Sequence, residues 1–184
     1  SNRDFGMELG SSIVYTDSLP LLAIPLKAIH TWLPDVFQYI GWWILACFLL
    51  QAALAWRLIG RFTGNWWLQA CATGVFCLSP PFLFGLHGQD ALFGHWIVLP
   101  ARLLYFSSVF CPARWLALLL VAALTHAYLL ILGLAVWAAD NLTRLWHRTL
   151  QPLPAALWAA GTFAALVVTM WQAGYFMLSR GALS

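Results

Sequence analysis

Long runs of uncharged apolar residues constrain this chain more than any other feature of its sequence. A helix that crosses the hydrocarbon layer of a bilayer needs about 20 apolar residues. Hydrophobic residues make up 62% of the 184 positions and charged residues only 8%, so several runs of that length are present. The pattern predicts an all-α integral membrane protein that is built as a polytopic helical bundle.

The chain divides into a lead-in segment over residues 1–36 and a transmembrane bundle over residues 37–184. Glycines and prolines forbid one long helix in the lead-in, so we expect an extracytoplasmic loop that lies on the membrane. Residues 19–29 are apolar but too short to cross, which suits an interfacial helix. We expect apolar spans over residues 37–59, 66–84, 92–106, 115–137 and 155–178, the second being disrupted by Ser79-Pro80-Pro81.

The basic residues predict the orientation, because Lys and Arg favour the cytoplasmic side of a membrane. If the 57–61 loop is cytoplasmic, a single crossing by residues 115–137 would put Arg144 and Arg148 outside. The conflict disappears if this run enters the membrane, turns near His126 and returns, each arm being too short to cross fully. We therefore expect a broken or re-entrant helix near His126. A straight helix with a basic outer loop is the alternative.

Ionisable side chains gather between two apolar runs, where His87, Asp90 and His95 lie within nine residues. Ionisable groups near a bilayer are costly unless they face a cavity, a partner or the interface, so this stretch is a candidate site. Carboxylate oxygen and imidazole nitrogen are ligands for divalent cations. The alternative is a glycine-rich turn in which Asp90 caps the next helix and the histidines lie at the interface.

Three further residues are candidates, each with a structural alternative. Asp17 is either the N-cap of the interfacial helix or a carboxylate for catalysis or metal binding. His126 either forms a hydrogen bond between helices or serves the site. Arg102 pairs with a carboxylate, snorkels to the interface, or contacts a lipid phosphate. The re-entrant topology brings Asp17, Asp90 and His126 towards one non-cytoplasmic cavity.

Other protein classes are disfavoured by the same sequence. The nine Lys and Arg residues are scattered and form no basic run, so nucleic acid is not an expected partner. The four cysteines contain no C-x-x-C pair, which argues against a zinc site or a disulfide framework. The chain begins without an initiator Met or a signal peptide, and we expect it to be a fragment of a longer membrane protein.

Four elements occur in a suggestive order: Thr16-Asp17-Ser18, Cys77-Leu-Ser-Pro-Pro81, Asp90 and Leu124-Thr125-His126. This order resembles the GT-C superfamily of lipid-phosphate-sugar-dependent glycosyltransferases, which includes protein O-mannosyltransferases and aminoarabinose transferases. The chain looks closer still to an uncharacterised bacterial branch with a His-Gly-x-x-Ala-Leu-Phe-Gly-His-Trp-like stretch. It departs from the pattern in having His126 where relatives have Lys, one Asp where many have paired acids, and no first span.

The resemblance implies inverting transfer of a sugar from a polyprenyl-phosphate donor at the outer face of the bacterial inner membrane. It implies Asp17 and Asp90 as catalytic carboxylates, which we also consider as ligands of a divalent cation. The residues expected to bind the substrate or its phosphate are His87, His95, His126 and Arg102. Membrane lipid and the polyprenyl-phosphate sugar are the expected partners.

A non-enzymatic transporter or membrane scaffold is the competing hypothesis. Transporters also break helices near the midplane and line them with isolated polar groups. A transferase should gather its two carboxylates in one outer cavity, whereas a transporter needs polar groups along a path through the bilayer. The identities of the sugar, lipid carrier, acceptor and metal, and the oligomeric state, do not follow from the sequence.

Overall fold

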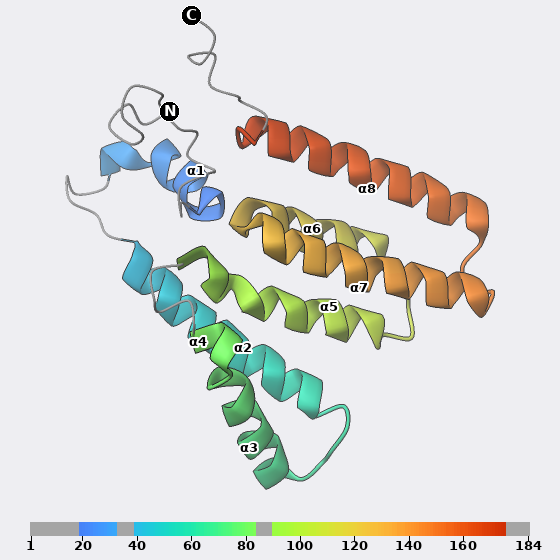
Figure 1. Cartoon of the computed structure of the whole chain (residues 1–184), viewed down its shortest axis with the longest axis horizontal. Coiled ribbons are helices and arrows are strands. Elements are labelled where there is room, and N and C mark those ends of the chain that lie inside the picture. Colours follow the sequence, from blue (N-terminus) through green and yellow to red (C-terminus); the bar gives the residue numbers. More distant parts are fainter. Residues whose placement is uncertain (1–18, 33–38, 84–89, 176–184) are drawn as a thin grey trace, which may run out of the picture.

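The computed structural model describes residues 19–32, 39–83 and 90–175, and within these ranges every regular element is a helix. Figure 1 shows α2, α5, α6, α7 and α8 lying beside one another in one bundle, with α3 next to α2 and α1 at one end. In chain order they are α1 (Pro20–Ala28), the 3-10 helix η3 (His30–Trp32), α2 (Ile40–Ile59), α3 (Trp66–Cys77), α4 (Pro80–Leu83), the 3-10 helix η5 (Asp90–Ile97), α5 (Val98–Tyr105), α6 (Pro112–Thr125), α7 (Ala127–Trp146) and α8 (Pro152–Gln172).

Three of the described helices, α2, α7 and α8, are long and apolar enough to cross a membrane. With 20 or 21 residues each, they are about 30 Å long at 1.5 Å per residue, which matches the hydrocarbon layer. Many of their Leu, Val, Phe and Trp side chains are exposed on the protein surface. Such a surface is unfavourable in water and suits lipid contact, so these helices support the expectation of a membrane protein.

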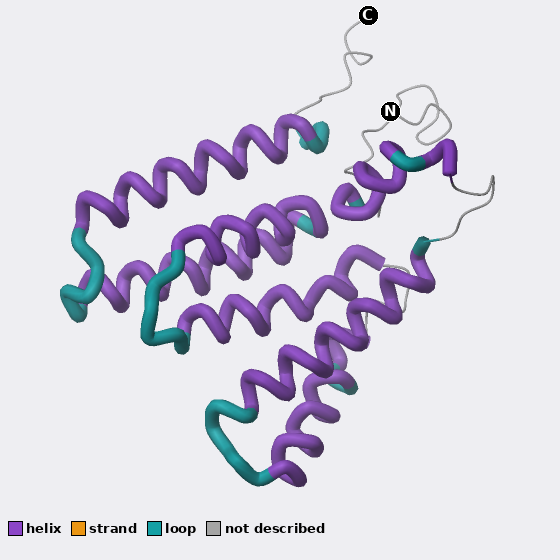
Figure 2. Tube along the Cα trace, turned by 180° about the vertical axis from the view of Figure 1, so that it is seen from behind, coloured by secondary structure: helices purple, strands orange, loops and turns teal. Residues whose placement is uncertain are grey.

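The expected break near His126 is present. Helix α6 ends at Thr125, His126 is extended with φ −163° and ψ 140°, and α7 begins at Ala127. The chain reverses there, as both views show (Figures 1 and 2). The antiparallel register is fixed near its open end by Trp115, whose indole N–H reaches Asp140.

The two arms of this hairpin differ in length, which corrects the expectation that neither is long enough to cross. Helix α6 has 14 residues, but α7 continues beyond Trp137 to Trp146 and has 20. Arg144 lies inside the last turns of α7, although the sequence places it in the polar loop between the 115–137 and 155–178 runs. Its charge is tolerated there because Asp140 and Arg144 form an ion pair one turn apart.

The second expected span, 66–84, is not one continuous helix. Helix α3 stops at Cys77 after 12 residues, and α4 starts at Pro80. Proline lacks a backbone N–H and favours the first turn of a new helix, which explains the break. At about 18 Å, α3 is shorter than the hydrocarbon layer. The third expected span is also composite, because it begins as η5 and continues as α5.

The main core lies among α5, α6, α7 and α8, where Leu119, Ala122 and Leu129 are fully buried. A second cluster joins Leu19, at the start of α1, to aromatic and aliphatic residues of α2, α4 and η5. Helix α1 therefore packs on the end of the bundle where η5 starts and α6 ends. Its position on the membrane surface stays a prediction.

The connections after α2, α5 and α7 lie together at the opposite end of the bundle (Figure 2). That end carries Arg57, Arg61, Arg114, Arg144 and Arg148, which come from α2, α6, α7 and the connections that follow α2 and α7. The two ends of the bundle therefore differ in chemistry. One is rich in arginine and the other contains the helix break at His126.

Candidate functional site

His126 is built into the backbone turn between α6 and α7. Its Nδ1 atom accepts a hydrogen bond of 3.1 Å from the backbone N–H of Tyr128, so the side chain acts as the N-cap of α7. A nitrogen that accepts a hydrogen bond carries no proton, which leaves Nε2–H as the donor of the neutral ring. The half-buried imidazole can therefore offer one N–H to a neighbouring acceptor.

The start of η5 packs tightly against this helix break. Gly94 is buried, and a Cβ atom placed on it would lie 2.7 Å from both Leu129 Cδ1 and Thr125 Cγ2. A side chain at position 94 would therefore require the buried side chains of Leu129 and Thr125 to shift. The next residue, His95, makes an edge contact with the ring of Tyr128, with 6.2 Å between ring centroids. Two of the candidate histidines therefore lie at the same end of the bundle.

The structure describes the other candidate site residues only in part. Asp17 and His87 lie outside the described residues. Asp90 is the first residue of η5, so its backbone lies at the end that carries His95, but its side chain is outside the description. Arg102 is exposed in the last turn of α5, towards the arginine-rich end and away from the histidines.

No group of three His, Cys, Asp or Glu side chains that could hold a metal ion occurs among the described residues. The carboxylates on which the expected cation depends, Asp17 and Asp90, do not have described side chains. The cation therefore stays a prediction.

A buried polar network at the arginine-rich end escaped the sequence reasoning. Asp140, only 2% exposed, accepts 2.9 Å and 2.7 Å hydrogen bonds from Trp115 Nε1 and Arg144 Nε, respectively. Arg144 also donates to the backbone carbonyls of Ser107 at 2.6 Å and Ser108 at 3.4 Å. The network ties α6, α7 and the α5–α6 connection together. The spacing of four residues between Asp140 and Arg144 was the available signal.

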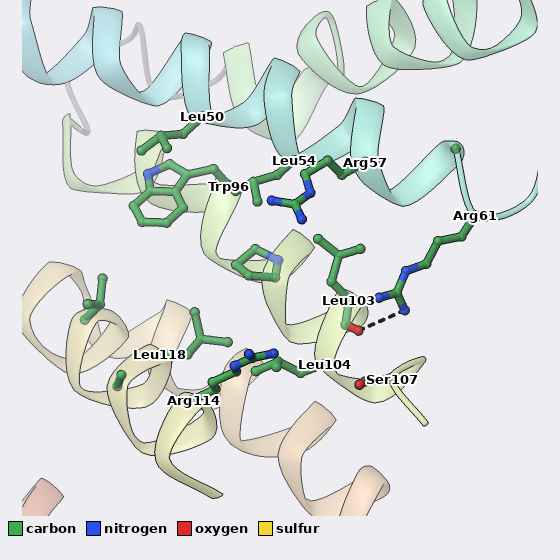
Figure 3. Close-up of a pocket in the computed structure, with 14 residues that line it drawn as sticks. Leu50, Leu54, Arg57, Arg61, Trp96, Leu103, Leu104, Ser107, Arg114 and Leu118 are labelled. Carbon is green, nitrogen blue, oxygen red and sulfur yellow. Dashed lines mark hydrogen bonds between the residues drawn. The ribbon is translucent and has the colours of Figure 1, made fainter. Parts of the chain in front are cut away.

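A groove of about 820 Å³ lies between α2, α5 and α6, with its arginines at the arginine-rich end and its walls reaching Trp96 of η5 and Val121 of α6. Figure 3 shows Arg57 extending from α2 and Arg114 from α6, on opposite walls. Arg61 is held at the rim by a 3.1 Å hydrogen bond from Nη1 to the carbonyl of Leu103. Apart from its polar rim, the groove is walled mainly by Leu50, Leu54, Trp96, Pro100, Leu103, Leu104, Ala117, Leu118 and Val121.

Together these features define an all-helical chain with three helices able to cross a membrane, a histidine-bearing end and an arginine-lined groove. A family model described as a domain of unknown function, DUF6311, matches residues 1–184, and the chain therefore belongs to that family. No curated protein and no solved structure matches the chain significantly.

Proposed function

We propose that this protein is a membrane glycosyltransferase that transfers a sugar from a polyprenyl-phosphate donor at the outer face of a bacterial inner membrane. The observation that carries the proposal is the packing of η5 against the α6–α7 break. This packing puts the backbone of Asp90, the ring of His95 and the N-capping His126 at one end of the bundle. An acid and two imidazoles at one membrane interface suit chemistry on a phosphate-linked sugar.

The charge distribution supports an external position for this end. Lys and Arg in short connections favour the cytoplasmic side, and five arginines lie at the opposite end of the bundle. A hairpin at His126 returns the chain to that same side, so the arginines of α7 and of the α7–α8 connection agree with the others. The histidine-bearing end then faces the outer leaflet, where the lipid-linked donor would present its sugar.

In the proposed reaction an acceptor hydroxyl attacks the anomeric carbon of the sugar. The new carbon–oxygen bond forms as the bond from that carbon to the phosphate oxygen breaks, and the electron pair leaves with the polyprenyl phosphate. Asp17 takes the acceptor's proton as general base, which is a contribution of about 10²–10⁴-fold in rate. His126 donates its Nε2–H to the departing phosphate, and Asp90 and His95 orient the reacting groups.

The test uses membranes from cells that express the intact protein, supplied with polyprenyl-phosphate mannose and polyprenyl-phosphate aminoarabinose in turn. We expect release of polyprenyl phosphate, and a loss of about 10²–10⁴-fold when Asp17 or Asp90 is replaced by Ala. His126→Ala should also slow release, whereas His147→Ala, at the other end of the bundle, should not. Release at the unmodified rate by both Asp variants would remove the basis of the proposal.

A transporter would give a different pattern. It would move the lipid or its sugar across the bilayer without breaking the bond to phosphate, so intact donor would be recovered after the reaction. Recovery of intact donor on the opposite leaflet, abolished by His126→Ala, would favour transport over transfer.

A further inference from the structure

We propose that the groove between α2, α5 and α6 is a binding site for an anionic phospholipid of the leaflet that faces the arginine-rich end. The arginines of the groove lie at the opposite end of the bundle from the histidines, and its apolar walls extend towards them as far as Trp96 and Val121. The proposal does not depend on the glycosyl-transfer proposal. Its volume of about 820 Å³ falls within the range of about 300–1,000 Å³ that is usual for ligand sites.

The electrostatics of the groove call for an anion. Arg57, Arg61 and Arg114 line it, and the described residues that line it include no Asp or Glu. The nearby Arg144 makes the contrast clear, because its charge is balanced by Asp140 at 2.7 Å. Arg61 is occupied in part by the carbonyl of Leu103, whereas Arg57 and Arg114 show no hydrogen bond or ion pair with any described residue. Two guanidinium groups without a carboxylate partner on the walls of one groove favour an anionic ligand such as a phosphate.

The rest of the lining argues for a lipid and against a small soluble phosphate. Away from the arginines the walls consist of aliphatic side chains and the indole of Trp96 (Figure 3). A soluble phosphate would contact the arginines and leave these walls exposed, whereas an acyl chain would cover them. Basic pockets between membrane helices on the cytoplasmic side are a recognised way of holding anionic lipid head groups.

The probes are phosphatidylglycerol, which is anionic, and phosphatidylcholine, which has no net charge. Both carry the same acyl chains, so only the head groups differ. Native mass spectrometry of the detergent-solubilised chain with both lipids should show retention of phosphatidylglycerol over phosphatidylcholine. One arginine near a lipid surface contributes about fivefold in affinity. Arg57→Gln and Arg114→Gln should therefore each weaken retention about fivefold, whereas Arg148→Gln, at the same end but outside the groove, should leave it unchanged.

A steric variant separates the groove from diffuse surface attraction. Ala117 lines the groove from α6 and is exposed to it, so Ala117→Trp should block the acyl chain while every arginine stays in place. We expect this variant to lose phosphatidylglycerol and to keep the unmodified protein's thermal unfolding temperature. A variant that unfolds early is replaced by Ala117→Phe.

Several results would overturn the proposal. Equal retention of the two lipids, or of neither, would show that the groove does not select an anionic lipid. An equal effect of Arg148→Gln would indicate general surface charge, and full retention by Ala117→Trp would place the lipid elsewhere. Displacement of phosphatidylglycerol by an equimolar amount of glycerol 3-phosphate would assign the arginines to a soluble phosphate.

Discussion

Replacing Asp140 by Ala should destabilise the chain by about 3–5 kcal/mol, the usual cost of removing one partner from a buried ion pair. The carboxylate accepts hydrogen bonds from Trp115 Nε1 and Arg144 Nε. Trp115 is 1% exposed, so its indole N–H would be left buried without an acceptor, which by itself costs about 1–3 kcal/mol. Arg144 keeps its hydrogen bonds to the carbonyls of Ser107 and Ser108 in this variant. The loss of stability should therefore be close to about 3 kcal/mol, the lower end of that range.

The estimate can be divided with two further variants. Trp115 Nε1 and Arg144 Nε bond different oxygens of the Asp140 carboxylate. Asp140→Asn keeps an acceptor for one of these donors and turns an N–H group towards the other, so it should cost about 1–3 kcal/mol. In a Trp115→Phe background no indole N–H can be left without an acceptor, so Asp140→Ala should cost about 1–3 kcal/mol less than in the unmodified chain. Thr143→Ala, an exposed change on the same helix, serves as the control and should stay within about 0.5 kcal/mol.

Equilibrium unfolding by sodium dodecyl sulfate in mixed micelles, followed by circular dichroism, measures these free energies. Two results would contradict this prediction. The free energy of unfolding of Asp140→Ala could lie within about 0.5 kcal/mol of that of the control, or Asp140→Ala could cost as much in the Trp115→Phe background as in the unmodified chain. Either result would mean that the Asp140 carboxylate is solvated and that the hairpin does not depend on it.

Two other substitutions test the packing at the histidine-bearing end. A Cβ atom at position 94 would lie 2.7 Å from Thr125 Cγ2, and Gly94→Val adds two methyl groups beyond it. This variant should lower the free energy of unfolding by about 1–3 kcal/mol. An unchanged free energy in the same titration would contradict the close approach of η5 to the helix break. His126→Ala removes the N-cap of α7 and should lower the free energy of unfolding by about 0.5–2 kcal/mol. His126→Asn should recover most of that loss, because Asn is a good N-cap residue. Failure of this variant to recover stability would argue against the capping role.

The break at His126 could be predicted because the positive-inside rule and the local sequence agree. A polar Thr-His pair interrupts an apolar run, and only a reversal there keeps the arginines on either side of the run in one compartment. The length of α7 could not be predicted in the same way. Charged residues such as Asp140 and Arg144 are typical of a loop after an apolar run. The structure shows that they neutralise each other in an ion pair on α7.

The groove was invisible for a different reason. Arg57, Arg61 and Arg114 come from separate helices or connections, and the sequence presents them only as topology markers. Their convergence depends on how α2 and α6 pack against α5. Pro80 and Pro81 predicted that the helix over residues 66–84 would be disrupted, but they did not predict that α3 would end at Cys77. Asp17 and His87 stay predictions because they lie outside the described residues.

Membrane sidedness at the three connections and at the helix break tests whether a hairpin at His126 returns the chain to its arginine-rich end. Single cysteines replace Thr63, Val109, Arg148 and Tyr128 in turn, in a chain whose four native cysteines have been changed to Ser. An impermeant thiol reagent is then applied to intact cells and to inverted vesicles. We predict labelling at positions 63, 109 and 148 from the cytoplasmic side, and at 128 from the outside. External labelling at 148 together with cytoplasmic labelling at 109 would contradict the hairpin.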